Sequence, residues 1–237
     1  ISGSLDHALG TARGLVAQMR QANPGHPLTN LMDAQVAFVD NDLAKSRELT
    51  QQLLRMFPDN ITALQMAGAI EGQSGSLVQA EAHYAKALKL NPELTAARRG
   101  LALVYMKLGR PDQALETLKP LLGPDSRHAD ALALAGDAHL RLRDVSTAEQ
   151  YFVRAAGLAP DDDRIRTALA LAYISRGGSE SAFAELEALA TKAQDSYAGR
   201  ALFAARMKRR EFDKALQAVD GLAQKSVPAA LLHEMRG

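Results

Sequence analysis

The chain has 237 residues, of which 47% are hydrophobic, so it is long enough and apolar enough to bury a large core. Its 28 Lys and Arg residues are matched by 27 Asp and Glu residues, which argues against a nucleic-acid partner because such a partner requires a concentrated basic stripe. Cysteine is absent, which excludes disulfides and thiolate metal sites without indicating a compartment. Polar side chains interrupt the apolar runs well before about 18 residues, so we expect no membrane-spanning segment.

The composition favours helix throughout the chain. Ala, Leu, Gln, Arg and Glu dominate, aromatic residues make up 5%, and runs of β-branched residues are missing. We therefore expect an all-α protein with about fourteen helices and no strands.

The first helix predicted in chain order lies within residues 1–26. Its residues 3–8 (GSLDHA) resemble residues 75–80 (GSLVQA), so the chain opens on the second helix of a unit whose first helix is absent. Because the chain starts at Ile1 and enters this helix directly, we interpret it as a piece of a longer protein.

Prolines then recur at a fixed interval of 34 residues. Stepping from Pro92 in both directions gives Pro24, Pro58, Pro160 and Pro228, with only Ser126 and Gln194 breaking the series. An interval of this length indicates a repeat array. We predict one array over residues 1–237, divided into a partial unit 1–26, units 27–60, 61–94, 95–128, 129–162, 163–195 and 196–227, and a partial unit 228–237.

Each full unit is expected to form two helices that separate at a weak breaker. The breakers are Asn41-Asp42, Gly75-Ser76, Gly109-Arg110-Pro111, Arg143-Asp144, Gly177-Gly178-Ser179 and Arg210-Glu211. Pro111 suits the first turn of a helix, where a backbone amide has no partner in any case. Asp59-Asn60 and the run 161–163 precede first helices, whose free amides these side chains would cap.

Small residues recur at the positions where helices must approach closely. Gly68, Gly136, Ala102 and Ala170 lie where the two helices of one hairpin are expected to meet, whereas Ala80, Ala114, Ala148 and Ala182 would admit the next hairpin. Tyr84, Phe152 and Leu118 would fill the space that the small residues leave.

This pattern resembles the tetratricopeptide repeat. The resemblance rests on Ala67-Gly68, Ala80, Tyr84, Ala87 and Pro92, and it recurs in the following units as Leu101-Ala102, Tyr105 and Ala114, as Ala135-Gly136, Ala148, Phe152 and Pro160, and as Leu169-Ala170, Tyr173 and Ala182. Three features depart from the family pattern: the usual Trp is absent, Ser46 and Thr50 occupy the small and aromatic positions of the first full unit, and the last unit slips in register near Met207.

The resemblance implies a right-handed α-solenoid whose first helices line a concave groove. In each unit, positions two, five, nine and twelve would face this groove, where apolar side chains alternate with charged and amide side chains and suit a peptide or protein ligand. The candidate binding residues are Gln35, Phe38, Gln65, Arg99, Leu103, Met106, Asp137, Arg141, Arg164, Leu171, Ile174, Arg200, Met207 and Lys208. The family's carboxylate clamp requires Asn residues that units two to five lack, so capture of an acidic C-terminus is not expected.

No motif for catalysis or cofactor binding occurs in the sequence. There is no HExxH, phosphate loop or nucleophile elbow, and none of the six histidines is paired at a ligand spacing. We therefore expect no enzyme activity, no catalytic residue, no cofactor and no metal.

A narrower resemblance points to a biological setting. Residues 113–122, 131–138, 166–172 and 210–216 resemble the repeat lipoproteins of the bacterial PEP-CTERM and exosortase system, which accompany exopolysaccharide production and surface-protein sorting. This likeness implies a protein-binding scaffold in the periplasm, anchored to the outer membrane by a lipid that lies outside the sequence. Two alternatives stay open: a cytoplasmic adaptor or peptide-sensing regulator, and the substrate-recognition arm of a larger enzyme such as a glycosyltransferase. The sequence leaves the oligomeric state open.

Overall fold

In a computed structural model, the chain is all-α, as predicted. The structure describes residues 2–23, 25–177, 180–192 and 196–223, together with Ala230, Leu232 and Met235. Thirteen α-helices, one 3₁₀ helix and no strand occur among these residues. Pro24, Gly178, Ser179, Gln194 and most of the predicted partial unit 228–237 lie outside them. The helices group into two compact units, residues 1–117 and 118–237.

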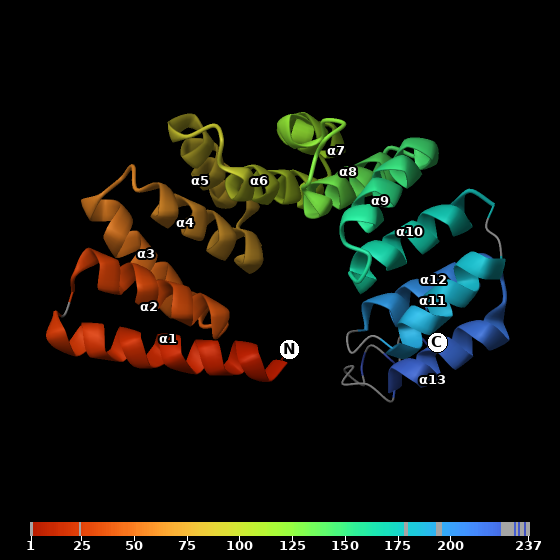
Figure 1. Cartoon of the computed structure of the whole chain (residues 1–237), viewed down its shortest axis with the longest axis horizontal. Helices are drawn as coiled ribbons and strands as arrows, with labels where there is room; N and C mark the ends of the chain where they lie inside the picture. Colours follow the sequence, from red (N-terminus) through yellow and green to blue (C-terminus); the bar gives the residue numbers. More distant parts are fainter. Residues whose placement is uncertain are drawn as a thin grey trace. The chain divides into compact units, whose positions relative to one another are not determined.

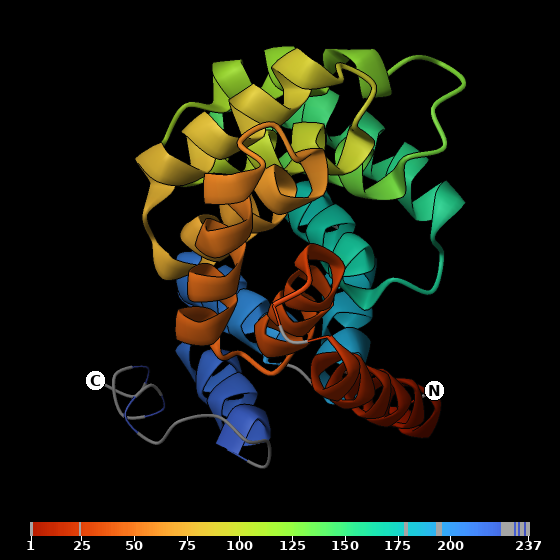
Figure 2. The same ribbon diagram turned by 90° about the vertical axis from the view of Figure 1, so that its left-hand side faces the viewer.

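Unit 1 contains seven helices, of which α1 to α6 each contact the next one along the chain (Figure 1). They are α1 (Ser2–Ala22), α2 (Pro27–Val39), α3 (Leu43–Met56), α4 (Ile61–Ser74), α5 (Leu77–Leu90), α6 (Thr95–Lys107) and α7 (Pro111–Leu118), whose last residue belongs to unit 2. The hairpins α2–α3 and α4–α5 stack through contacts of α3 with α4, as Figure 2 shows from the side. Each of these hairpins lies within one of the 34-residue ranges expected from the sequence.

Unit 2 repeats the same arrangement. It contains the 3₁₀ helix η1 (Lys119–Leu121) and the helices α8 (Ala129–Arg141), α9 (Val145–Leu158), α10 (Asp163–Ser175), α11 (Glu180–Lys192), α12 (Tyr197–Lys208) and α13 (Phe212–Ala223). The pairs α8–α9, α10–α11 and α12–α13 are hairpins, and α9 contacts α10 just as α11 contacts α12. Stability therefore comes from neighbouring hairpins stacked in sequence.

Helix α7 is shorter than the other second helices. It has 8 residues, against 14 in α3, α5 and α9. Pro120 lies two residues beyond its end, and a proline both lacks the amide that would continue the helix and disfavours helical backbone in the residue before it, here Lys119. The chain therefore leaves the helix after Leu118 and tightens into the 3₁₀ turn η1.

A left-handed residue marks the turn after each of six first helices. The φ of this residue is 60° at Asn41, 84° at Gly75, 72° at Gly109, 63° at Arg143, 120° at Gly177 and 61° at Arg210. At five of these turns the next amide donates to the carbonyl five residues earlier, as from Ser76 to Glu71 and from Asp144 to His139, both 2.9 Å. This bond closes the end of the first helix, a common role of left-handed residues.

The predicted caps are present. The Asn60 side chain accepts from the Ala63 amide at 2.9 Å and starts α4, while Asp162 accepts from the Arg164 amide at 2.9 Å and starts α10. Pro111 is the first residue of α7.

Glycines let aromatic rings enter the space between helices. A Cβ atom at Gly68 would lie 2.8 Å from the Tyr84 ring, and one at Gly136 would lie 2.7 Å from the Phe152 ring. These contacts confirm the predicted close approach within the hairpins α4–α5 and α8–α9. Gly100 of α6, which the sequence pattern did not single out, faces Tyr84 as well, so the ring is held between two first helices.

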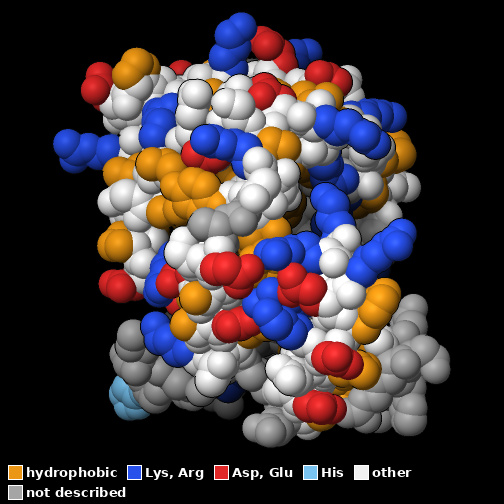
Figure 3. Space-filling view, turned by 90° about the vertical axis from the view of Figure 1, so that its right-hand side faces the viewer, with side chains coloured by type: hydrophobic (Ala, Val, Ile, Leu, Met, Phe, Trp, Pro, Cys, Tyr) orange, Lys and Arg blue, Asp and Glu red, His pale blue; other side chains and the backbone are white. Residues whose placement is uncertain are grey.

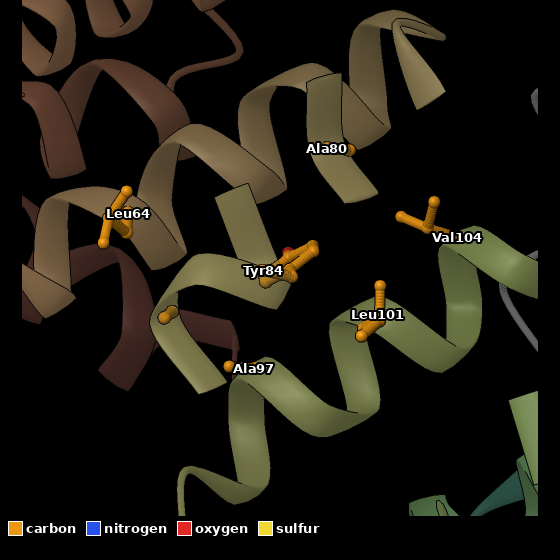
Figure 4. Packing of buried hydrophobic residues seen from close by; sticks show 7 residues of the cluster. Leu64, Ala80, Tyr84, Ala97, Leu101 and Val104 are labelled. Carbon is orange, nitrogen blue, oxygen red and sulfur yellow. The ribbon is translucent and has the colours of Figure 1, made fainter. Parts of the chain in front are cut away.

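The small residues between hairpins are buried as expected. Ala80, Ala114 and Ala148 have no exposed surface, and Ala182 is 6% exposed. In Figure 4, Tyr84 stands between Leu64 of α4 and Leu101 of α6, and Ala80 lies on the same side of α5 as Tyr84. A larger side chain at Ala80 or Ala148 would push two hairpins apart.

Candidate functional site

Within unit 1, and likewise within unit 2, the first helices of successive 34-residue repeats lie side by side and form a continuous surface. In unit 1, α4 contacts both α2 and α6; in unit 2, α10 contacts both α8 and α12. We call these surfaces the first-helix face of unit 1 and the first-helix face of unit 2.

On the first-helix face of unit 1, three of the six candidate residues are exposed. They are Gln35, Arg99 and Leu103, and Leu103 keeps 49% of its surface open to solvent although it is apolar. Phe38 and Gln65 are partly buried. Met106 is only 4% exposed, so its side chain packs inside the protein and does not present a contact to a ligand.

The first-helix face of unit 2 is more strongly charged. The exposed candidates are Asp137, Arg141, Arg164, Arg200, Met207 and Lys208. Leu171 and Ile174 are partly buried, because they pack against the core cluster that includes Phe183 and Leu202. This face therefore consists of an apolar floor between α10 and α12 with basic side chains around it.

Asp137 has an altered acidity. The surrounding protein excludes part of the water that would solvate its carboxylate, and this raises its pKa to about 6, although the charge of Arg141 works in the opposite direction. Solvent still reaches the side chain. Near neutral pH the carboxylate is therefore mostly ionised but more easily protonated than an ordinary aspartate.

Two further exposed positions on α12 belong to the same face. Tyr197 is 37% exposed and Ala204 is exposed, and they occupy positions two and nine of the predicted repeat that starts at residue 196. The positional rule used for the other candidates would have included both residues. Tyr173 of α10, 40% exposed, lies one position outside that rule.

A buried cation connects α11 to the last described hairpin. Arg206 of α12 is 2% exposed, lies 3.9 Å above the Phe183 ring and pairs with Glu187 of α11 and with Glu211. This buried Arg could not be predicted from the sequence, because an Arg at a core position looks like a slip in the register of the repeat, as noted near Met207. Burial is tolerated because two carboxylates and an aromatic face replace the water around the guanidinium.

Charges of both signs are mixed over the surface. In the space-filling view of Figure 3, Lys and Arg side chains stand beside Asp and Glu side chains, with apolar patches between them. No group of three or more metal-binding side chains occurs among the described residues. In the same part of the chain, no helix combines the length and apolarity needed to cross a membrane.

The fold defines a helical-repeat protein, and comparisons with family models identify the kind of repeat. Two models, both described as tetratricopeptide repeat, match residues 73–138 and 133–199. The chain therefore contains tetratricopeptide repeats, as its sequence pattern predicted.

Solved structures extend this fold over nearly the whole chain. A tetratricopeptide repeat protein from Parabacteroides merdae matches with a TM-score of 0.77 and 17% identity, over 98% of this chain and 92% of that one. The hetero-tetramer of the APC/C proteins Cut9 and Hcn1 matches with a TM-score of 0.80 and 17% identity, over 96% of this chain and 45% of that one.

Curated relatives match only short parts of their own length. Cellulose synthase operon protein C of Xanthomonas axonopodis pv. citri is 27% identical over 167 residues, which span 67% of this chain and 11% of that protein. A DnaJ homolog subfamily C member 7 homolog of Schizosaccharomyces pombe is 34% identical over 67 residues, 28% of this chain and 14% of that protein. The narrower resemblance to the PEP-CTERM lipoproteins finds no counterpart among these matches.

Proposed function

We propose that this chain is an interaction scaffold that binds a peptide or protein segment on its first-helix faces and performs no chemistry of its own. The tetratricopeptide fold supports protein binding as the general role. The observation that carries the proposal is the difference in exposure between two sets of residues in the repeats. Small and aromatic residues are buried where the helices stack, whereas Leu103, Arg200 and Met207 stay exposed on the first helices. Recognition by such a surface depends on these exposed positions.

The proposed setting is a bacterial envelope assembly that handles an exopolysaccharide or sorts surface proteins, with the scaffold in the periplasm and anchored to the outer membrane. Two likenesses support this setting: the PEP-CTERM lipoprotein pattern in the sequence and the match to cellulose synthase operon protein C, since cellulose is itself a polysaccharide.

Site-specific photocrosslinking tests the scaffold role. A photoreactive phenylalanine analogue is placed at Leu103, which is exposed on α6, and in a matched control at Val78, which is 69% exposed on the second helix α5. The full-length protein carrying either analogue is then irradiated in its native host.

We expect a discrete adduct with one or a few proteins from position 103 and none from position 78. Equal adducts from both positions, or none from position 103, would contradict binding on the first-helix face. Fractionation of the same cells tests the setting separately: recovery in the cytosol would contradict the envelope location and favour a cytoplasmic adaptor.

A further inference from the structure

Helix α12 presents a basic stripe that has no acidic counterpart on the helix itself. Residues 197–208 (YAGRALFAARMK) contain three cations and no carboxylate. Arg206 is buried and paired, but Arg200 and Lys208 are exposed, and among the described residues no ion pair to either of them occurs. Two positive charges on this face are therefore solvated in the free chain.

These two cations share one side of α12 with apolar surface. Arg200, Ala204 and Lys208 are spaced four residues apart, and Met207 lies beside Lys208, so all four side chains are on the same face of the helix. Ala204 is exposed and small, which leaves a shallow gap between the two cations. Met207, 40% exposed, borders the gap with a flexible apolar side chain.

The neighbouring helix α10 continues this surface. Leu171 and Ile174 of α10, like Ala201 of α12, are partly buried and pack against the cluster that contains Leu202, so they form the apolar floor of this surface. Arg164, at the start of α10, keeps 69% of its side chain exposed while it lies 3.5 Å from Asp162. The surface thus combines an apolar floor with cations, a chemistry that matches carboxylates flanked by apolar side chains.

The spacing of the cations selects an extended ligand. Eight residues of helix separate Arg200 from Lys208, so their Cα atoms lie about 12 Å apart at a rise of about 1.5 Å per residue. An extended chain rises about 3.3 Å per residue, so residues four apart cover about 13 Å and point to the same side. Two carboxylates with this spacing would reach both cations, and the side chain midway between them would face Ala204.

We propose that the surface formed by Arg200, Ala204, Met207 and Lys208 binds an extended acidic segment of a partner protein, in which two Asp or Glu residues four apart flank an apolar residue. This inference rests on the proposed scaffold function and names the chemistry of its ligand. An acidic peptide fits better than a nucleic acid, because the cations are few, the whole chain carries a formal charge of only +1, and apolar side chains lie between the cations.

Fluorescence anisotropy with designed peptides tests the proposal. The probe is a fluorescein-labelled nonapeptide of Ser and Gly with Glu at the third and seventh positions and Leu at the fifth. Its two controls are the same peptide with Gln in place of Glu, and a peptide that carries the second Glu at the sixth position, on the opposite side of an extended chain. Each peptide is titrated with the chain at low ionic strength, because exposed ion pairs are screened by salt.

We expect saturable binding of the probe and about three- to tenfold weaker binding of the Gln analogue, which loses two exposed ion pairs. The peptide with the displaced Glu loses one of the two pairs and should bind with an affinity between those of the other two. The charge-reversed variant Arg200→Glu/Lys208→Glu should lose this preference. The matched control Lys89→Glu, an exposed cation on α5, should keep it.

No saturable binding, equal binding of the probe and its Gln analogue, or equal effects of the two charge reversals would overturn the proposal. Tighter binding of a labelled oligothymidylate than of the probe would overturn it as well and identify a nucleic-acid surface. Circular dichroism of each variant confirms that the fold is retained. If the peptides fail while photocrosslinking at position 103 still yields an adduct, only the acidic-segment inference is wrong and the scaffold function stands.

Discussion

At the scale of single residues, the absence of a side chain is as decisive as its presence. Gly68, Gly100 and Gly136 each lie against an aromatic ring with no room for a methyl group. Gly157 on α9, by contrast, has nothing within 4 Å of the position where a Cβ would be. The same residue type therefore has opposite roles in two helices of one hairpin.

We expect Gly136→Ala to destabilise the protein by about 1 to 3 kcal/mol, because its methyl group would displace the buried Phe152 ring. Gly157→Ala should instead stabilise it by about 0.5 to 1 kcal/mol, since alanine favours helix and meets no neighbour. The free energy of unfolding in urea checks both. Equal effects of the two substitutions would contradict the packing described for Phe152.

The turn residues allow a second prediction. Arg143 holds a left-handed φ of 63° where Gly75 and Gly109 occupy the equivalent turns. Left-handed backbone costs about 1 kcal/mol for a residue with a side chain, and glycine avoids most of this strain. Arg143→Gly should therefore leave stability unchanged or raise it, whereas Gly75→Ala should lower it by about 1 kcal/mol. Thermal unfolding of both variants measures the difference, and a loss of stability in Arg143→Gly would show that its side chain matters more than its turn.

The residue scale is also where prediction from sequence was most successful. Gly68, Gly136, Ala80, Ala148, Tyr84 and Phe152 could be placed because stacking requires the same small and large residues in every unit. Gly100, Arg206 and the burial of Met106 could not. Each depends on what a neighbouring helix presents at one particular contact, and no periodic pattern encodes that.

At the scale of helices, polar contacts join five second helices to the end of the following first helix or to the turn after it. In unit 1, Arg13 of α1 pairs with Asp40, Arg47 of α3 donates to Ser74 at 2.7 Å, and Glu81 of α5 pairs with Arg110 at 3.4 Å. In unit 2, Glu149 of α9 pairs with Arg176 at 2.7 Å and Glu180 of α11 with Arg209 at 3.3 Å. These contacts recur at intervals close to 34 residues or a multiple of it. The second helix contributes the cation in α1 and α3 but the carboxylate in α5, α9 and α11.

A double-mutant cycle on Glu149 and Arg176 tests whether these contacts help to stack the hairpins. Each charge reversal, Glu149→Arg or Arg176→Glu, should destabilise the protein by about 0.5 to 1 kcal/mol, because each places like charges together. The double reversal should restore most of the loss. Additive losses in the double variant, measured in urea at low salt, would show that the pair contributes nothing.

Cations on second helices form another recurring contact, with the preceding loop. Lys86 of α5 donates to the Pro58 carbonyl at 2.7 Å, and Arg154 of α9 donates to the Leu122 carbonyl at 3.3 Å. Both side chains lie at the tenth position of their helix and meet carbonyls in the loop that follows the preceding second helix. In the repeat that contains the short helix α7, the position equivalent to Lys86 and Arg154 is occupied by Pro120, which has no cationic side chain. The presence of each helix could be predicted from the 34-residue period. The early end of α7 could not, because Pro120 lies outside the 34-residue series of prolines on which the prediction was based.

At the scale of the whole molecule, the fold class could be predicted almost completely, whereas the binding site could be predicted only as a face. Periodic residues define the stack, and they repeat. Exposed residues such as Leu103 and Arg200 do not recur in every repeat, so the positional rule places them without indicating what they bind.

Removing one whole period tests the modular build of unit 1. Deletion of residues 61–94, which contain α4 and α5, should leave a helical protein that unfolds cooperatively at a lower temperature, since α3 would then meet α6 in place of α4. Deletion of residues 61–76, which removes α4 alone, should cost far more stability because it leaves two second helices in succession. Circular dichroism during heating compares the two. Similar melting curves would contradict the hairpin as the unit of stacking.

The reversal of charge along the chain sets a limit on shuffling its hairpins. A hairpin ending in α9 carries Glu149 where α1 carries Arg13, so if it were spliced ahead of α2 it would bring a carboxylate against Asp40. Exchanging hairpins whose second helices contribute the same charge would keep opposite charges adjacent, whereas exchanging hairpins with different charges would not. The sign of a few surface charges thus partly determines the order in which these otherwise similar hairpins can follow one another.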